Sequence, residues 1–239
     1  MLRRIISKFF ITILPIDFLK QSADVQNFLK LAKNNGINTI LDIGANTGQY
    51  AELLFEHGYD GKIVSFEPLT EAHKVLLQKE KSFPNWIIAD RCALGEMDKE
   101  VTIHISKNLK SSSILPMLKM HSDTDPESRY VSSENVPMFT LDTIGPKYLD
   151  EDAVIFLKMD VQGYEKNVLA GAEDLFNRIK GIQLECSLSP LYDGELLLAD
   201  LIKKIEGRGF RLYDIIPGFR DPASGILLQT DCIFLKKTA

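Results

Sequence analysis

The chain has 239 residues, 45% of them hydrophobic, and a formal net charge of −5. This length suits a single domain with a sizeable core, and the composition is that of a globular protein. The acidic balance argues against nucleic acid as a partner, because phosphate backbones favour basic surfaces. The three cysteines, Cys92, Cys186 and Cys232, lie in or beside apolar runs, so we expect buried thiols in the reducing cytoplasm rather than disulfides.

The first 18 residues begin with two arginines and continue with apolar residues, in the order of a signal peptide. However, Lys8 interrupts the apolar run, no small-residue cleavage site follows, and the run is too short to span a bilayer. Two interpretations stay open: a helix that packs on the domain, or a helix that makes a peripheral membrane contact. A further helix is predicted to begin at Ser22 or Asp24, so we treat residues 1–35 as an N-terminal helical extension.

A glycine turn follows the first strong strand pattern. The apolar run at 37–43 predicts a buried strand, and a helical pattern follows at 50–57. Gly44 and Gly48 between them predict a tight turn, which lets a ligand approach the unpaired N–H groups of a helix N-terminus. Asn46 stands where dinucleotide-binding turns carry their second glycine, so a ligand without a pyrophosphate fits better. S-adenosylmethionine is such a ligand.

A second strand is predicted at 62–66, and Pro68 stops it directly after Glu67. An acidic residue about 20 positions after a glycine turn, at the end of the next strand, is placed to bind ribose hydroxyls. A third strand at 86–89 leads into a loop at 90–95, which could line an adenine. A plain exit from the strand is the alternative for this loop.

A long polar segment separates two further strands, which we predict at 101–105 and 136–141. Long irregular segments inside a compact domain are often functional. We therefore interpret 106–135 as a substrate lid. His121 lies in this segment and is the histidine that we would test as a base.

The run at 153–157 is nearly all apolar, as is typical of a central parallel strand buried on both faces. Alternation along the strand puts Lys158 and Asp160 on one side, at the carboxyl end where ligands bind in open α/β sheets. The remaining elements are expected to be a helix at 164–178, a strand at 181–186, a helix at 195–206, and an antiparallel pair at 210–214 and 231–235. The alternation of strands and helices predicts an α/β fold: a mostly parallel sheet, helices on both faces, and an antiparallel edge.

Four motifs together resemble those of the FkbM family of S-adenosylmethionine-dependent methyltransferases. They lie at 42–48, 66–68, 93–95 and 157–165, in the family's order. The resemblance covers roughly 36 to 236, and its most specific part is the segment Lys-x-Asp-x-Gln-Gly-x-Glu, in which many members have Glu in place of Gln162. It implies a class I, Rossmann-like methyltransferase domain over 36–239, S-adenosylmethionine as cofactor, and O-methylation, often of a sugar or secondary-metabolite hydroxyl.

Strand ends and resemblance together define a candidate site. The residues expected to hold the cofactor are Asp42, Gly44, Ala45, Asn46, Thr47, Gly48, Glu67, Pro68, Asp90, Cys92 and Ala93. An acceptor hydroxyl must lose a proton, and the candidate general bases are Asp160 first and Glu185 second. Lys158 could orient Asp160 or favour its charged form. The alternatives are a structural Lys158–Asp160 pair, or Asp160 binding the cofactor's amino end.

Several alternatives remain at this point. Asp160, Glu185 and Asp193 carry oxygen ligands that would suit Mg²⁺, but no spacing demands a metal, so we expect none. The expected partner is a small-molecule or glycan acceptor. A catalytically inactive binding or scaffold domain is the main rival. A nicotinamide-dependent oxidoreductase is less favoured because its glycine pattern is missing, and a nucleic-acid methyltransferase because its Pro-Pro signature is missing.

Overall fold

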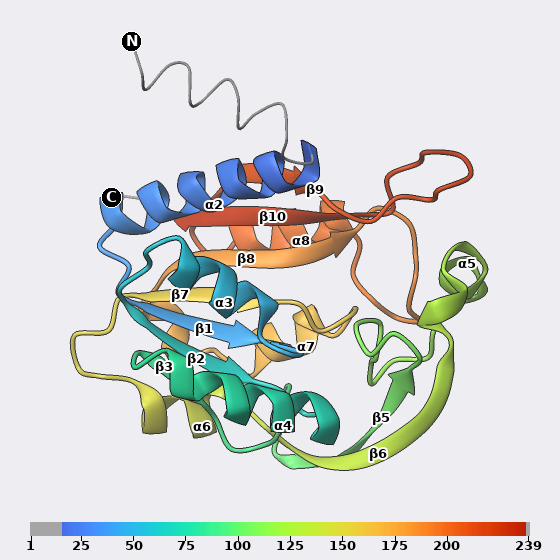
Figure 1. The fold of residues 1–239 in the computed structure, drawn as a ribbon, viewed down its shortest axis with the longest axis horizontal. Helices are drawn as coiled ribbons and strands as arrows, with labels where there is room; N and C mark the ends of the chain where they lie inside the picture. Colours follow the sequence, from blue (N-terminus) through green and yellow to red (C-terminus); the bar gives the residue numbers. More distant parts are fainter. Residues whose placement is uncertain (1–15, 238–239) are drawn as a thin grey trace.

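The structure is a computed structural model that describes residues 16–237, with side chains from residue 23 onward. Its centre is a seven-stranded sheet in the order β3-β2-β1-β7-β8-β10-β9 (Figure 1). The first five strands are parallel, and β10 runs antiparallel to both of its neighbours. The strands are β1 (Thr39–Ile43), β2 (Lys62–Phe66), β3 (Trp86–Ile88), β7 (Ile155–Met159), β8 (Ile179–Ser187), β9 (Phe210–Pro217) and β10 (Gln229–Lys236). The predicted α/β fold with an antiparallel edge is confirmed.

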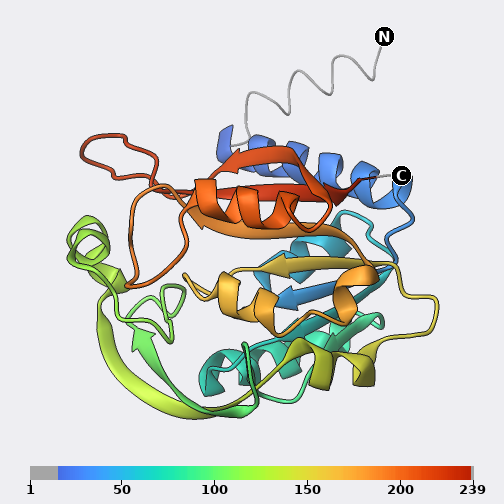
Figure 2. The same ribbon diagram turned by 180° about the vertical axis from the view of Figure 1, so that it is seen from behind.

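Helices cover both faces of this sheet. One face carries α2, α3 and α4, and the view from behind shows α6, α7 and α8 on the other (Figures 1 and 2). The bounds are α2 (Ile16–Asn34), α3 (Gln49–Glu56), α4 (Thr70–Lys79), α6 (Leu141–Ile144), α7 (Glu165–Ala170) and α8 (Leu198–Glu206), with the short 3₁₀ helices η1 (Glu80–Ser82), η2 (Pro126–Ser128), η3 (Gly145–Tyr148) and η4 (Leu175–Asn177). Successive side chains of β1 point to opposite faces of the sheet. Ile40 packs in the apolar cluster of α2 and α3, and Leu41 packs in that of α7 and α8.

A second, three-stranded sheet in the order β4-β6-β5 extends from the carboxyl ends of the main strands. Its strands are β4 (Ala93–Leu94), β5 (Lys99–Ser106) and β6 (Tyr130–Phe139), and a short helix, α5 (Lys119–Thr124), lies between β5 and β6. The prediction that the second of these strands starts at residue 136 was therefore wrong by six residues. The first half of β6 is polar and largely exposed, so its pairing with β5 leaves no apolar alternation in the sequence.

Two helix boundaries also differ from the predictions. The helix expected at 164–178 ends at Ala170, because the next residue, Gly171, lies so close to the backbone of Gly95 that a Cβ there would overlap its carbonyl oxygen. At the N-terminus, α2 already begins at Ile16. The two interpretations of the first 18 residues fall mainly on residues 1–15, outside the described part of the chain. In residues 16–237 the structure shows no helix long and apolar enough to cross a membrane.

The core contains an aspartate and a lysine, Asp42 and Lys158, at positions where apolar residues are usual. All five residues of β1 and all five of β7 are buried, and the two strands pair directly. Asp42 and Lys158 nevertheless lie within these strands, opposite each other in the register. Burying a charge is costly unless it is paired. The opposite charges of Asp42 on β1 and Lys158 on β7 supply such a pair. The three cysteines are buried free thiols, as predicted.

Candidate active site

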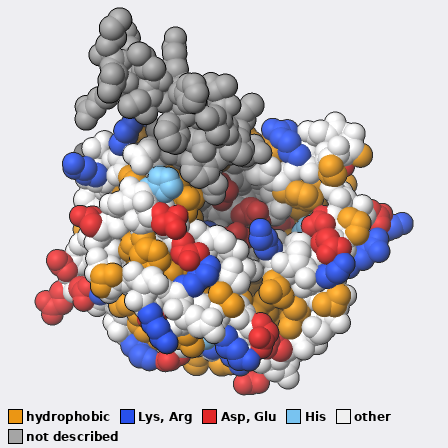
Figure 3. All heavy atoms as spheres, in the orientation of Figure 1, with side chains coloured by type: hydrophobic (Ala, Val, Ile, Leu, Met, Phe, Trp, Pro, Cys, Tyr) orange, Lys and Arg blue, Asp and Glu red, His pale blue; other side chains and the backbone are white. Residues whose placement is uncertain are grey.

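A cavity of about 490 Å³ opens at the carboxyl ends of β1, β2, β7 and β8. This volume is in the range of small-molecule sites, and the position is the one at which open α/β sheets bind ligands. The space-filling view shows acidic and basic side chains close together around a hollow in this face (Figure 3). Polar residues from the main sheet form one part of the wall. Residues 108–114 with His121 and Asp125, all from the predicted lid, form another.

The glycine turn is shaped by packing as well as by ligand access. Gly44 has φ +76°, and a Cβ there would overlap the backbone oxygen of Asp160. Gly48 has φ +87°, and a Cβ there would clash with the indole of Trp86. Both positions therefore require glycine in any folded form of this chain. Asn46, between them, also has a left-handed backbone, with φ +49°.

Glu67 joins the second strand to this turn. Its Oε2 accepts a hydrogen bond from the Asn46 backbone N–H at 2.7 Å, and its Oε1 accepts one from the Leu69 N–H at 2.8 Å. The side chain lines the cavity although the residue is only 4% exposed. Burial raises the pKa of Glu67 to about 7, with the two backbone N–H groups acting in the opposite direction. A carboxylate has about four lone-pair sites, so two remain for hydroxyl groups of a ligand.

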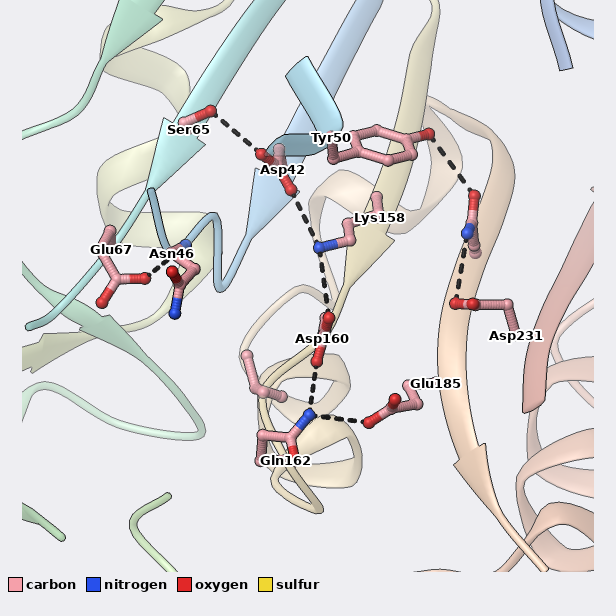
Figure 4. Close-up of polar contacts among 12 residues, drawn as sticks. Asp42, Asn46, Tyr50, Ser65, Glu67, Lys158, Asp160, Gln162, Glu185 and Asp231 are labelled. Atoms are coloured by element: carbon pink, nitrogen blue, oxygen red, sulfur yellow. Dashed lines mark hydrogen bonds and ion pairs between the residues drawn. The ribbon is translucent and has the colours of Figure 1, made fainter. Parts of the chain in front are cut away.

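Lys158 stands between two carboxylates. Its Nζ lies 3.2 Å from Asp42 Oδ1 and 3.8 Å from Asp160 Oδ2, and it faces the ring of Tyr50 at 5.4 Å from the centroid (Figure 4). Burial alone would lower the pKa of Lys158, but the charges of Asp42 and Asp160 raise it above its ordinary value. Ser65 donates a hydrogen bond to the second Asp42 oxygen at 3.1 Å. Lys158 is therefore charged, and it connects the interior ion pair to the cavity.

A second group of carboxyl side chains lies beyond Asp160. One nitrogen, Nε2 of Gln162, donates to Asp160 Oδ1 at 2.7 Å and to Glu185 Oε2 at 2.8 Å (Figure 4). Burial and then the charges of Asp160 and Asp231 raise the pKa of Glu185 well above its ordinary value. Asp231, on β10, accepts a hydrogen bond from Gln183 at 3.2 Å. The cavity floor thus combines carboxyl groups, amides and one lysine.

The structure brings most of the predicted site residues together. The cavity is lined by Gly44, Ala45, Asn46, Glu67, Pro68, Cys92, Ala93, Lys158, Asp160 and Glu185. Asp42, Thr47 and Gly48 are not part of this lining: Asp42 pairs with Lys158, and Gly48 packs against Trp86. Asp90 differs: its carboxylate pairs with Lys147 from η3 on the outer surface. The described residues of this loop that reach the cavity are Cys92, Ala93 and Leu94.

Among the described residues, sequence reasoning missed six polar side chains of the cavity wall outside the predicted lid: Gln49, Tyr50, Tyr164, Gln183, Gln229 and Asp231. Gln183 lies two positions before Glu185 on β8, and Asp231 pairs with Glu185 across β8 and β10. The signal that was available is their alternation, since residues two apart on a strand share a face. That signal becomes specific only once β10 is known to lie beside β8.

The sequence matches a known family over most of its length. The family described as the methyltransferase FkbM domain matches residues 42–212. The chain belongs to this family. The resemblance of the four motifs is thereby confirmed, and this FkbM methyltransferase is an S-adenosylmethionine-dependent enzyme by family. Nothing in this family assignment supports the nicotinamide-dependent alternative.

Comparison with curated protein sequences gives no match. Among solved structures, the magnesium protoporphyrin IX methyltransferase from Synechocystis PCC 6803 with bound S-adenosylmethionine is 10% identical, with a TM-score of 0.49 over 92% of this chain and 81% of that one. The precorrin-6y C5,15-methyltransferase from Geobacter metallireducens is 13% identical, with a TM-score of 0.43 over 84% and 81% of the two chains. The family match, not these distant likenesses, decides the assignment.

Proposed function

We propose that this FkbM methyltransferase binds S-adenosylmethionine in the cavity over β1, β2 and β7 and methylates a hydroxyl group of a sugar, a glycan or a secondary metabolite. The observation that carries the proposal is a hydrogen bond that joins the residues after two neighbouring strands: the Asn46 backbone N–H donates to the Glu67 carboxyl group at 2.7 Å. Glu67 accepts two backbone hydrogen bonds in all, so its carboxylate can still accept hydrogen bonds from two ribose hydroxyls. Cys92 and Ala93 supply an apolar surface for the adenine. The residues present therefore fit the cofactor.

The cavity floor suits an acceptor rich in hydroxyl groups. S-adenosylmethionine, when bound, supplies a methyl group on a sulfonium that is already a good leaving group. The protein must then align the acceptor, and positioning of this kind can supply about 7–11 kcal/mol of a barrier. Gln162, Gln183 and Gln229 offer amides and Asp160 and Glu185 offer carboxyl groups, all of which pair with hydroxyls.

Asp160 is the first candidate for the general base. Its side chain is 39% exposed and lines the cavity, so an acceptor hydroxyl can reach it directly. Its Oδ2 lies 3.8 Å from Lys158 Nζ, and Gln162 donates to its Oδ1, so the carboxyl group is held in place at the cavity where a base must meet the acceptor hydroxyl. Glu185 is the second candidate, since a carboxyl group with a raised pKa is a stronger base once it is ionised. His121 lies in the cavity wall, and burial lowers its pKa, so it is neutral and could also accept a proton.

The function is tested by incubating the purified full chain with S-adenosylmethionine carrying a labelled methyl group and a panel of sugars, glycans and polyketide-type alcohols. We expect label in a base-stable ether linkage on a hydroxyl of the acceptor. Cofactor binding in calorimetry without transfer to any member of the panel would favour the inactive scaffold. Label on an amine or on nucleic acid would contradict O-methylation.

The ribose role of Glu67 predicts a pH-dependent cofactor affinity. Because the pKa of Glu67 is about 7 in the free protein, the group is largely protonated at pH 5–6. Only the ionised form can accept from both ribose hydroxyls, so binding should release a proton below pH 7 and tighten as the pH rises through 7. Glu67→Gln should bind about 10- to 100-fold more weakly at pH 8, as expected for lost hydrogen bonds to a charged group, and its affinity should not vary with pH.

Calorimetry in two buffers of different ionisation enthalpy measures both the affinity and the proton release. Glu71→Gln is the matched control, because Glu71 is an exposed glutamate on α4. An affinity of Glu67→Gln equal to that of the control at pH 8 would remove the ribose assignment.

A further inference from the structure

Gln162 occupies an unusual place in the site. It follows β7 with a left-handed backbone, φ +53°, and the next residue, Gly163, has φ +91°. Non-glycine residues rarely adopt this conformation, and it persists only where the surroundings hold it. The residue is 8% exposed and lines the cavity. The local strain is therefore maintained at the centre of the candidate site.

The contacts of Gln162 use both ends of its side-chain amide. The nitrogen donates to Asp160 and Glu185, as described above, and the oxygen accepts from the Tyr192 hydroxyl at 2.7 Å. The backbone oxygen of Gln162 accepts from Ser113 Oγ, also at 2.7 Å. An amide nitrogen has two N–H donors, and here each has a carboxyl oxygen as its acceptor. A glutamate in the same conformation would instead place a third carboxyl group against the first two.

We propose that Gln162 is the positioning residue of the carboxyl pair Asp160–Glu185: through a single nitrogen it holds both groups toward the acceptor hydroxyl, as a bound cation would. The proposal rests on the proposed function, because the pair matters for catalysis only if one of its members is the base. It adds a specific role to the position at which many family members carry Glu. It also explains why the strained backbone is retained.

The charges around Glu185 explain how the Gln162 amide acts on the carboxyl pair. Glu185 faces carboxyl groups from three elements: Asp160 after β7, Asp231 on β10 and Glu165 on α7. Lys158 is the charge that acts in the opposite direction. Two amide nitrogens, from Gln162 and from Gln229, donate to the same oxygen of Glu185 at 2.8 Å each. Hydrogen bonds to the charged form favour it, so loss of the Gln162 donor makes ionisation of this pair harder.

The same side chain ties the pair to the predicted lid. Tyr192, which donates to Gln162, also lies 3.0 Å from the backbone oxygen of Ser111, and Ser113 donates to the Gln162 backbone. Both serines belong to the wall of the cavity. A change at Gln162 therefore acts on the carboxyl pair first and on the lid segment through it. Glu67, on the adenosine side, accepts its hydrogen bonds from Asn46 and Leu69 instead, so we expect it to be unaffected.

The test uses the full chain with Gln162→Glu and Gln162→Met, and with Gln78→Glu on the exposed side of α4 as control. We expect the acidic limb of the kcat–pH profile to move upward by about one pH unit or more in both variants, corresponding to a hydrogen bond to a charged group. The larger move is expected for Gln162→Glu. Cofactor affinity should stay within about twofold of the wild-type value. A fall in melting temperature with an unmoved acidic limb would show a merely structural role and overturn the proposal.

Two further readouts do not depend on turnover. Carbon-13 NMR of carboxyl-labelled, cofactor-free protein should show the Glu185 signal titrating at higher pH in Gln162→Met than in wild type. Calorimetry with Mn²⁺ alone should show binding to Gln162→Glu, in which three carboxyl groups meet, about tenfold or more tighter than to Gln78→Glu. Equal titration in the first and equal Mn²⁺ affinity in the second would overturn the proposal. An absence of methyl transfer by the wild type would instead count against the proposed function.

Discussion

Replacing Lys158 with methionine should destabilise the protein by about 3–5 kcal/mol, the cost of leaving a buried charge without its partner. Asp42 is fully buried, and its Oδ1 has Lys158 Nζ at 3.2 Å as its charged neighbour. Its other oxygen, Oδ2, accepts a hydrogen bond from the Ser65 hydroxyl, which cannot neutralise the charge. Methionine keeps most of the volume of lysine, so the loss measures the charge rather than a cavity. Urea unfolding of the variant and the wild type at pH 7 measures this difference in the free energy of unfolding.

Lys158→Met in an Asp42→Asn background separates the loss of the Asp42–Lys158 charge pair from other effects of replacing the lysine. With the buried charge removed, Lys158→Met should cost much less than in the wild type, and the double-mutant cycle should give a coupling of about 2 kcal/mol or more. Lys74→Met is the control, because Lys74 forms an exposed i,i+3 pair on α4, which should be worth less than about 1 kcal/mol. Equal costs of Lys158→Met in both backgrounds would mean that the pair does not carry the stability.

Asp160→Asn should lower kcat by about 10²- to 10⁴-fold, the usual contribution of a positioned general base. Asparagine keeps the shape and can still contact Gln162, so the cofactor should bind with nearly unchanged affinity. Glu185→Gln should have a smaller effect, since burial and the charges of Asp160 and Asp231 raise the pKa of Glu185 and disfavour its ionised form. Single-turnover methyl transfer together with calorimetry separates these quantities, and Asp193→Asn, an exposed carboxyl group outside the cavity lining, is the control.

The opposite pattern has a definite meaning. If Asp160→Asn weakened cofactor binding strongly and left single-turnover transfer nearly intact, Asp160 would bind the amino end of the cofactor instead of acting as a base. Glu185 would then be the remaining carboxyl candidate. The structure is compatible with either contact because the Asp160 side chain is 39% exposed and lines the cavity.

The parts of the site that the sequence predicts are local. Gly44, Gly48 and Glu67 sit at the ends of two adjacent strands, and their roles follow from turn chemistry and strand order alone. Lys158 and Asp160 follow from alternation at the end of an apolar strand. In each case the residues lie at the carboxyl end of one strand or of two strands that follow each other in the sequence, so short-range spacing already predicts their proximity in space.

The parts that the sequence does not predict depend on long-range pairing. Asp231 and Gln229 reach the cavity because β10 inserts between β8 and β9, a register that no local pattern specifies. Asp90 turns outward because Lys147, 57 residues later, offers it a charged partner. The end of α7 at Ala170 likewise depends on the approach of Gly95. Such tertiary contacts override helix and loop preferences.

The small sheet has a consequence for how acceptor preference can diverge in this family. β4 and β6 pair in parallel through Ala93–Met138 and Leu94–Phe139, so the strand next to the Cys92 loop is continuous with the hairpin that frames residues 108–114. A chimera that imports the hairpin of a relative must keep these two rungs, or it will shift the wall beside the cofactor. Where they are kept, we expect residues 99–136 to form an exchangeable module, in which selectivity for the proposed methyl acceptor could evolve without rebuilding the main sheet.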